Sequence, residues 1–193
     1  MLNKRDDDQF LLVTYPRTGS HFLHFYLKQL TGFSLKKTHF PRWSEGKKVI
    51  TIIRDPQETL KSGFAMHQHV ALMKDKDWIL QENKSALTSV SGYIDFFEYM
   101  IKNSDVIIDY NTLINSPYSV CKFLAEYIGI EINEEEEYIQ VLKDDDPEIW
   151  PNSGGHYLVS SKTSPQYNNT DISWIDFSQH YEKYYEALAR KSI

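Results

Sequence analysis

The sequence predicts an α/β protein with three layers, in which a central parallel sheet carries helices on both faces. Short runs of apolar and β-branched residues alternate with longer amphipathic runs along the chain, and this alternation favours parallel strands joined by helices. No segment rich in Pro, Gly or Ser divides the chain, and no segment is repeated. We therefore expect residues 1–193 to form a single domain.

Each expected element follows from its local pattern. The strands are the apolar or β-branched runs near residues 10–14, 34–38, 49–53 and 105–109. The third run is continuous enough for a strand that is buried on both faces. The helices are the amphipathic runs near residues 20–31, 56–66, 85–103, 117–129, 134–143 and 176–190. Residues 67–84 have no clear period, and we expect a loop or a broken helix there. Residues 144–172 also lack a pattern, and a loop of this length in a compact domain usually has a function or is mobile.

The loop between the first strand and the first helix has the composition of an anion site. Backbone N–H groups at the start of a helix are unpaired and lie at the positive end of its dipole. Gly19 allows close approach of the backbone, while Arg17 adds a charge and Thr18 and Ser20 add hydroxyls. A nucleoside-triphosphate loop ends in Gly-Lys-Ser/Thr, but here Ser20 and His21 follow the glycine. Taken alone, the segment fits an ordinary strand-to-helix turn equally well.

A second cationic strand end follows the run of residues 49–53. Arg54 comes directly after that strand, at the edge where open α/β sheets bind ligands. Pro56 suits the first turn of a following helix, and Ser62 lies just over two helical turns beyond Arg54. A hydroxyl and a guanidinium could thus face one anion. The alternative is that Arg54 only forms an ion pair with a helix.

Four segments together resemble the motifs of sulfotransferases, in the order that this family has them. Thr14–Ser20 resembles the family's 5′-phosphosulfate loop, and Arg54–Ser62 resembles its 3′-phosphate motif. Lys37–Pro41 is similar to the segment that carries the general base in cytosolic members. Val106–Leu113 resembles a later strand end, and the expected helix near 117–129 follows it as in the family.

The resemblance implies a P-loop NTPase-like fold that binds 3′-phosphoadenosine 5′-phosphosulfate (PAPS). The sulfuryl group would pass in line to a hydroxyl or amine, leaving 3′-phosphoadenosine 5′-phosphate (PAP). The transferring group bears less charge than a terminal phosphoryl group, so cations and backbone dipoles can stabilise its transition state without a metal. The family is therefore expected to use no metal here.

The resemblance also implies roles for individual residues. His39 is the expected general base, since its ordinary pKa lies near neutrality, although a histidine at a strand end can also be purely structural. Arg17 would stabilise charge on the leaving phosphate, and Lys37 would assist at the sulfuryl group. The residues expected at the 5′-phosphate are Arg17, Thr18, Gly19, Ser20 and His21. Those expected at adenine are Phe22 and Tyr110, and those at the 3′-phosphate are Arg54 and Ser62, closed over by Lys162 or Ser161.

Composition limits the possible partners. The formal net charge of −6 argues against a nucleic-acid binder that depends on bulk electrostatics. No apolar run approaches the ~18 residues of a membrane span, and no apolar signal region follows Met1, so a cytoplasmic location is expected. The acceptor is expected to be a small molecule, a sugar or a peptide, and the sequence does not choose among them.

Two other functions remain open at this point. One is a nucleotide-binding module that keeps the site but has lost catalysis, because the interval from Gly19 to His39 is shorter than in typical cytosolic sulfotransferases. The other is a metal-dependent P-loop phosphotransferase, which would need the Gly-Lys-Ser/Thr ending that this loop lacks.

Overall fold

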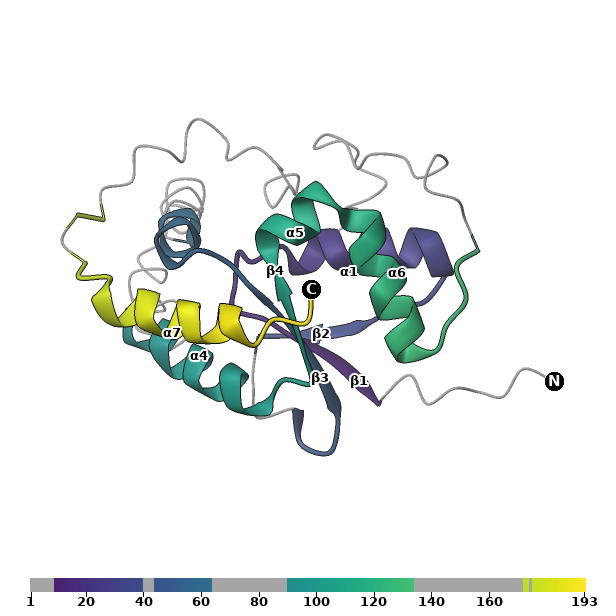
Figure 1. Ribbon diagram of the computed structural model, residues 1–193, viewed down its shortest axis with the longest axis horizontal. Coiled ribbons are helices and arrows are strands. Elements are labelled where there is room, and N and C mark those ends of the chain that lie inside the picture. Colours follow the sequence, from purple (N-terminus) through teal and green to yellow (C-terminus); the bar gives the residue numbers. More distant parts are fainter. Residues whose placement is uncertain (1–8, 40–43, 64–89, 134–171, 174) are drawn as a thin grey trace, which may run out of the picture.

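The computed structural model describes residues 9–39, 44–63, 90–133, 172–173 and 175–193 (Figure 1). These residues form a four-stranded sheet in which every neighbouring pair of strands is parallel. The strands are β1 (Phe10–Val13), β2 (Lys36–Thr38), β3 (Lys48–Ile53) and β4 (Val106–Asp109). Their order across the sheet is β2-β1-β3-β4.

Helices cover both faces of this sheet. One face carries α1 (Ser20–Thr31), α5 (Tyr110–Asn115) and α6 (Pro117–Ile128), and the other carries α4 (Val90–Asn103) and α7 (Ser178–Ala189) (Figure 1). Across the sheet, the connection from β1 to β2 runs in one direction and the connection from β3 to β4 runs in the opposite direction. Because such crossovers are right-handed, this change of direction places α1 and α4 on opposite faces.

Two separate cores result, one on each face of the sheet. The α1-side core is built mainly from Leu12, Leu23, Leu27, Leu30, Ile50, Ile52, Ile108, Val120 and Leu124. The α7-side core is built mainly from Leu11, Val13, Val49, Ile53, Tyr93, Phe97, Met100, Ile107 and Tyr184. Alternate residues of the same strands enter the two cores, as the pleat requires. All of β3 except its first residue is buried, which confirms a strand covered on both faces.

The general α/β arrangement expected from the sequence is confirmed, with the four strands close to their expected positions. The helices expected near 20–31, 117–129 and 176–190 correspond to α1, α6 and α7. Residues 56–63 are helical, and α4 covers the described part of the helix expected near 85–103. The helix expected near 134–143 and the segments 67–84 and 144–172 lie outside the described residues, apart from Ile172.

The sequence does not predict α5, which begins directly where β4 ends. Asp109 is both the last strand residue and the N-cap of this helix, and its carboxylate accepts a hydrogen bond from the backbone N–H of Thr112 at 3.4 Å. Aspartate favours this position because it satisfies an unpaired helix N–H. Within the described ranges, the structure contains no helix long and apolar enough to cross a membrane.

Candidate functional site

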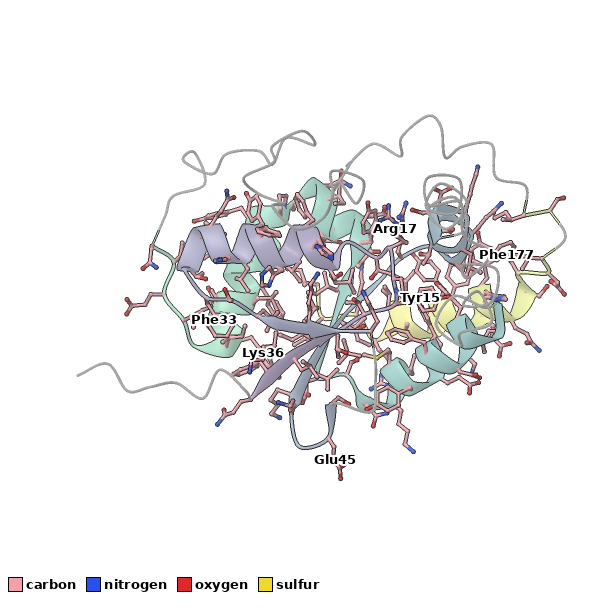
Figure 2. All side chains as sticks on the ribbon, turned by 180° about the vertical axis from the view of Figure 1, so that it is seen from behind. Tyr15, Arg17, Phe33, Lys36, Glu45 and Phe177 are labelled. Atoms are coloured by element: carbon pink, nitrogen blue, oxygen red, sulfur yellow. The ribbon has the colours of Figure 1, made fainter. Side chains whose placement is uncertain are left out.

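The candidate site lies at the carboxyl ends of β1 and β3, where the direction of the chain connections reverses. From β1 the chain leads to β2 on one side, whereas from β3 it leads to β4 on the other side. The loops that leave these two strand ends diverge, and ligands of open α/β sheets bind at this kind of position. Figure 2 shows Arg17 at this end of the sheet and Glu45, which precedes β3, at the opposite end.

The loop after β1 has an unusual backbone conformation. Arg17 has φ of 70°, which is uncommon for a residue with a side chain, and Gly19 has φ of 89°. Gly19 is also the N-cap of α1, and no side chain caps this end of the helix. The positive end of the helix dipole at this position favours a bound anion. Strained backbone of this kind is often found at ligand sites.

Arg54, directly after β3, reaches across to this loop. Its Nη1 donates a hydrogen bond of 2.9 Å to the backbone carbonyl of Arg17. Its guanidinium also lies over the ring of Tyr110, with 4.5 Å between its central carbon and the ring centroid, and pairs with Glu58 at 3.8 Å. The side chain of Arg54 is only 13 % exposed, so these contacts fix its position. The interpretation of Arg54 as an ion-pair partner alone does not account for the first two contacts.

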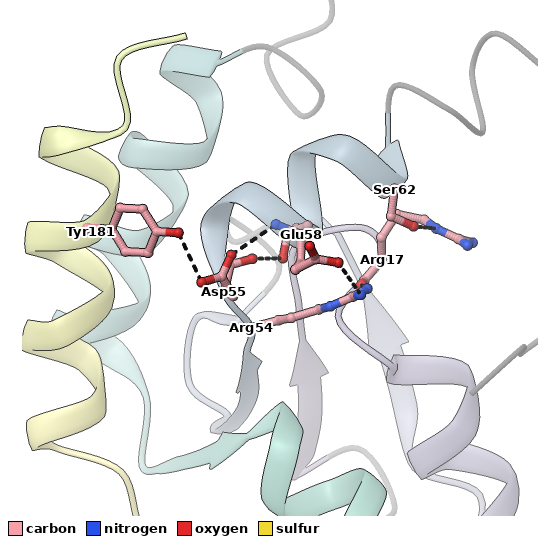
Figure 3. Close-up of polar contacts among 7 residues, drawn as sticks. Arg17, Arg54, Asp55, Glu58, Ser62 and Tyr181 are labelled. Atoms are coloured by element: carbon pink, nitrogen blue, oxygen red, sulfur yellow. Dashed lines mark hydrogen bonds and ion pairs between the residues drawn. The ribbon is translucent and has the colours of Figure 1, made fainter. Parts of the chain in front are cut away.

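Ser62 joins the two predicted phosphate motifs. It lies on the helical segment of residues 56–63, is 5 % exposed, and accepts a hydrogen bond of 3.0 Å from Nε of Arg17 (Figure 3). A serine hydroxyl that accepts one hydrogen bond still has its own O–H to donate. The structure therefore brings Arg17, Arg54 and Ser62 into one connected group, although they come from two loops and a helix.

His39 follows β2 and lies beside the first loop. Its Nδ1 is 2.7 Å from the backbone carbonyl of Thr14. A carbonyl only accepts, so Nδ1 carries the proton and Nε2 keeps a lone pair. Burial lowers the pKa of His39, and the charge of Lys37 lowers it further, which outweighs the opposing effect of the Thr14 hydrogen bond. His39 is thus held neutral, in the tautomer in which Nε2 can accept a proton as a general base.

Lys37 and His21 form a second pair at this edge. Nζ of Lys37, on β2, donates a hydrogen bond to Nε2 of His21, in the first turn of α1. Burial lowers the pKa of Lys37 to about 8. Partial burial of its ring and then the charge of Lys37 lower the pKa of His21 to about 4, so this imidazole is a neutral acceptor near pH 7. Lys37 therefore places a positive charge near the imidazole of His39, whose pKa that charge lowers.

The remaining predicted residues have more structural surroundings. The hydroxyl of Thr18 is buried and donates to the carbonyl of Tyr15 at 2.8 Å, which closes the turn, and Ser20 is also buried. Phe22 packs against the α1-side core and lies 5.7 Å from Tyr26 between ring centroids. Contacts of Phe22 and of Tyr110 with adenine stay predictions.

Gly19 is needed for a reason that the sequence does not reveal. A Cβ atom at this position would lie 3.0 Å from the ring of Tyr110 and 3.4 Å from Leu113. The glycine therefore lets α5 pack closely on the first loop, in addition to allowing a positive φ. Lys162 and Ser161, expected to close the 3′-phosphate site, lie outside the described residues.

Three residues that support the site were not singled out as site residues from the sequence. Asp55 begins the helical segment after Arg54, and its Oδ1 accepts from the backbone N–H of Glu58 at 2.9 Å. Tyr93, on α4, donates its hydroxyl to the backbone carbonyl of Arg54 at 3.0 Å. Tyr181, on α7, donates to Oδ2 of Asp55 at 3.1 Å. The Asp-Pro pair at the start of a helix is a readable capping signal, whereas no local pattern marks the two tyrosines.

As a chemical arrangement, the site joins the N-terminus of α1 and two guanidinium groups to a lysine and a neutral imidazole. Such groups bind an anion with more than one negative centre, and the imidazole can take a proton from a second molecule. Comparison of the whole sequence with protein-family models and with curated proteins gave no match in either case.

Proposed function

We propose that this chain is a sulfotransferase that moves a sulfuryl group from PAPS to a hydroxyl or amine acceptor, on a P-loop NTPase-like fold. The observation that carries the proposal is the connection of the two predicted phosphate motifs. Arg54 donates to the carbonyl of Arg17, and Arg17 donates to Ser62, at the point where the strand connections diverge. A donor with phosphate groups at both the 3′ and 5′ positions of its ribose suits two cationic strand ends that lie side by side.

The donor fits the chemistry of these residues. The uncapped N–H groups at the start of α1, together with Arg17, suit the 5′ end, where negative charge grows as the sulfuryl group departs. Arg54 and Ser62 suit the 3′-phosphate, because a largely buried guanidinium and an O–H donor both favour phosphate oxygens. The cation of Lys37 is suited to the sulfuryl oxygens.

In the proposed reaction, the acceptor oxygen or nitrogen forms a bond to sulfur while the bond from sulfur to the bridging 5′-phosphate oxygen breaks. The acceptor proton passes to Nε2 of His39, and the leaving PAP keeps the electron pair of the broken bond. The hydrogen bond from Nδ1 of His39 to Thr14 supports this role, because it leaves Nε2 as the basic atom. Arg17 and the helix N–H groups stabilise the charge on the leaving phosphate.

Binding of PAP tests the donor assignment. We expect calorimetric titration to detect PAP binding to the wild-type chain and no comparable binding of ATP with Mg²⁺. Arg54→Ala should weaken PAP binding at least about 30-fold, since removal of one partner of a buried charged pair costs about 2 kcal/mol or more. The control is Arg190→Ala, which removes the same charge from the exposed end of α7 and should leave the affinity unchanged.

A preference for ATP with Mg²⁺ over PAP would exclude the proposal. A chain that binds ATP with Mg²⁺ and not PAP would be a metal-dependent phosphotransferase or a binding module of another kind. Equal loss of affinity in Arg54→Ala and Arg190→Ala would mean that only general electrostatics attract the nucleotide.

A further inference from the structure

A hydrogen bond links α7 to the start of the Arg54–Ser62 motif. The hydroxyl of Tyr181 lies 3.1 Å from Oδ2 of Asp55, although the two residues are 126 positions apart in the chain (Figure 3). A carboxylate oxygen only accepts, so the phenol is the donor. Burial, and then the charge of Asp55, raise the pKa of Tyr181 to about 12, so the phenol keeps its proton at any ordinary working pH.

The carboxylate of Asp55 divides its two oxygens between two elements. Oδ1 accepts from the backbone N–H of Glu58 at 2.9 Å and caps the helical segment of residues 56–63. Oδ2 accepts from Tyr181. The backbone carbonyl of Asp55 in turn accepts from both the N–H and the hydroxyl of Thr59, at 2.9 and 2.8 Å. Asp55 is therefore fixed from both sides, by its own helix and by α7.

Both proposed ligands of the 3′-phosphate depend on where Asp55 lies. Arg54 is the residue before it, and Ser62 lies on the helical segment that Asp55 caps. A rotation at Asp55 would change the direction in which Arg54 leaves β3 and the distance of Ser62 from Arg17. Ligand groups need to be held within a few tenths of an ångström, and this requires a supporting layer of hydrogen bonds.

We infer that Tyr181 is a positioning residue that holds Asp55, and through it Arg54 and Ser62, in the arrangement that recognises the 3′-phosphate of the nucleotide. This inference rests on the proposed function. It gives α7 a part in nucleotide selectivity, because the phenol of Tyr181 would favour nucleotides with a 3′-phosphate without contacting them.

The experiment compares two nucleotides that differ only in that group. PAP and AMP are titrated calorimetrically into the wild-type chain, into Tyr181→Phe and into Tyr185→Phe. Phenylalanine at position 181 keeps the ring, which stacks 5.9 Å from Tyr185, and removes only the hydroxyl. Tyr185→Phe is the matched control, since Tyr185 lies one turn further along α7 and is 62 % exposed. A thermal melt of each variant establishes that the fold is intact.

We expect Tyr181→Phe to weaken PAP binding about three- to tenfold, the usual effect of losing one hydrogen bond, and to change AMP binding less than about twofold. Tyr185→Phe should change neither. In an Arg54→Ala background, Tyr181→Phe should have almost no further effect on PAP, because the two residues act on the same phosphate.

Other outcomes overturn this inference in distinguishable ways. Unchanged PAP binding in Tyr181→Phe would refute it and leave the proposed function intact. An equal loss for PAP and AMP would show that the hydroxyl supports the fold in general and not the 3′-phosphate site. A wild-type chain that does not prefer PAP to AMP would refute the proposed function, and the inference with it.

Discussion

Lys37, on β2, and His39, directly after it, both have pKa values below their ordinary values. The two residues are expected to control opposite limbs of a pH profile. Burial lowers the pKa of Lys37 to about 8, so its ammonium loses its proton just above the physiological range. Burial also lowers the pKa of His39 below its ordinary value of 6.5, so its imidazole stays neutral until the solution is acidic. A cationic Lys37 and a neutral His39 are thus present together between these limits, as the proposed reaction requires.

This pairing predicts a bell-shaped dependence of kcat/KM on pH. Since kcat/KM reports the groups of the free protein, the proposed sulfuryl transfer should fall above about pH 8, as Lys37 is deprotonated. It should fall again in acid as His39 is protonated, at a pH lower than the ordinary pKa of histidine. In Lys37→Arg the alkaline limb should disappear while the acid limb remains, because a guanidinium keeps its charge throughout. Initial rates across pH 5 to 10, with PAPS at subsaturating concentration and one acceptor held fixed, measure both limbs.

The wild-type chain and Lys37→Arg must be compared over the same buffers. If the alkaline limb persists in Lys37→Arg, another group controls it and Lys37 is not the required cation. An acid limb at the ordinary histidine pKa would show that His39 is less buried in solution than in this structure.

Among single residues, those marked by local chemistry could be predicted from the sequence. Arg17 and Arg54 each follow an apolar run, and both lie at the sheet edge that this position implies. That Ser62 and Arg54 share an anion stays a prediction, and the sequence does not predict the hydrogen bond that Ser62 accepts from Arg17. The direct contact depends on how the helical segment of residues 56–63 is turned, and sequence spacing does not determine that rotation.

At the scale of elements, α1 begins where α5 packs against it, and Gly19 is the point of contact. A Cβ atom at position 19 would lie 3.0 Å from Cε2 of Tyr110. The ring of Tyr110 in turn lies beneath the guanidinium of Arg54. A side chain at position 19 would therefore displace a ring that supports Arg54. Gly46 has a similar φ, 73°, but nothing lies within 4 Å of its Cβ position.

Substitution of these two glycines by alanine distinguishes the cost of backbone strain from the cost of steric overlap. Gly46→Ala should lower the free energy of unfolding by about 1–2 kcal/mol, the cost of a left-handed residue with a side chain. Gly19→Ala should cost about 2 kcal/mol more, because overlap with Tyr110 is added to the same strain. Urea unfolding measures both differences. In a Tyr110→Ala background the extra cost should largely vanish, and an equal cost for the two glycines would contradict the packing argument.

The elements themselves differ in how well the sequence predicts them. β3 is a continuous β-branched run, and its burial on both faces follows from composition alone. α5 could not be recognised, because its N-cap, Asp109, is at once the end of an apolar strand and the start of only six helical residues. On α7 both Tyr184 and Tyr181 pack against the α7-side core, but no local pattern predicts that Tyr181 also bonds to Asp55, 126 positions away.

At the scale of the whole molecule, the order of the strands assembles the site. Alternating strands and helices imply a parallel sheet, but they do not say which strands are neighbours. The order β2-β1-β3-β4 puts the ends of β1 and β3 side by side and places His39, after β2, against Thr14. This order depends on how two cores fill on opposite faces, and that is a property of the assembled chain.

Because β1, β3 and β4 contribute side chains to both cores, the two faces should unfold together. Leu27→Ala in the α1-side core and Phe97→Ala in the α7-side core each remove a fully buried side chain and should each lower the free energy of unfolding by about 3 kcal/mol or more. In both variants, urea transitions followed by far-UV and by near-UV circular dichroism should coincide and keep the wild-type slope. Lys122→Ala, on the exposed side of α6, should change stability by less than about 0.5 kcal/mol. If either core variant instead gave two separate transitions, the two faces of the sheet would unfold as independent units. The expectation of a single domain would then be wrong, and α7 would be too weakly coupled to the sheet to position Arg54.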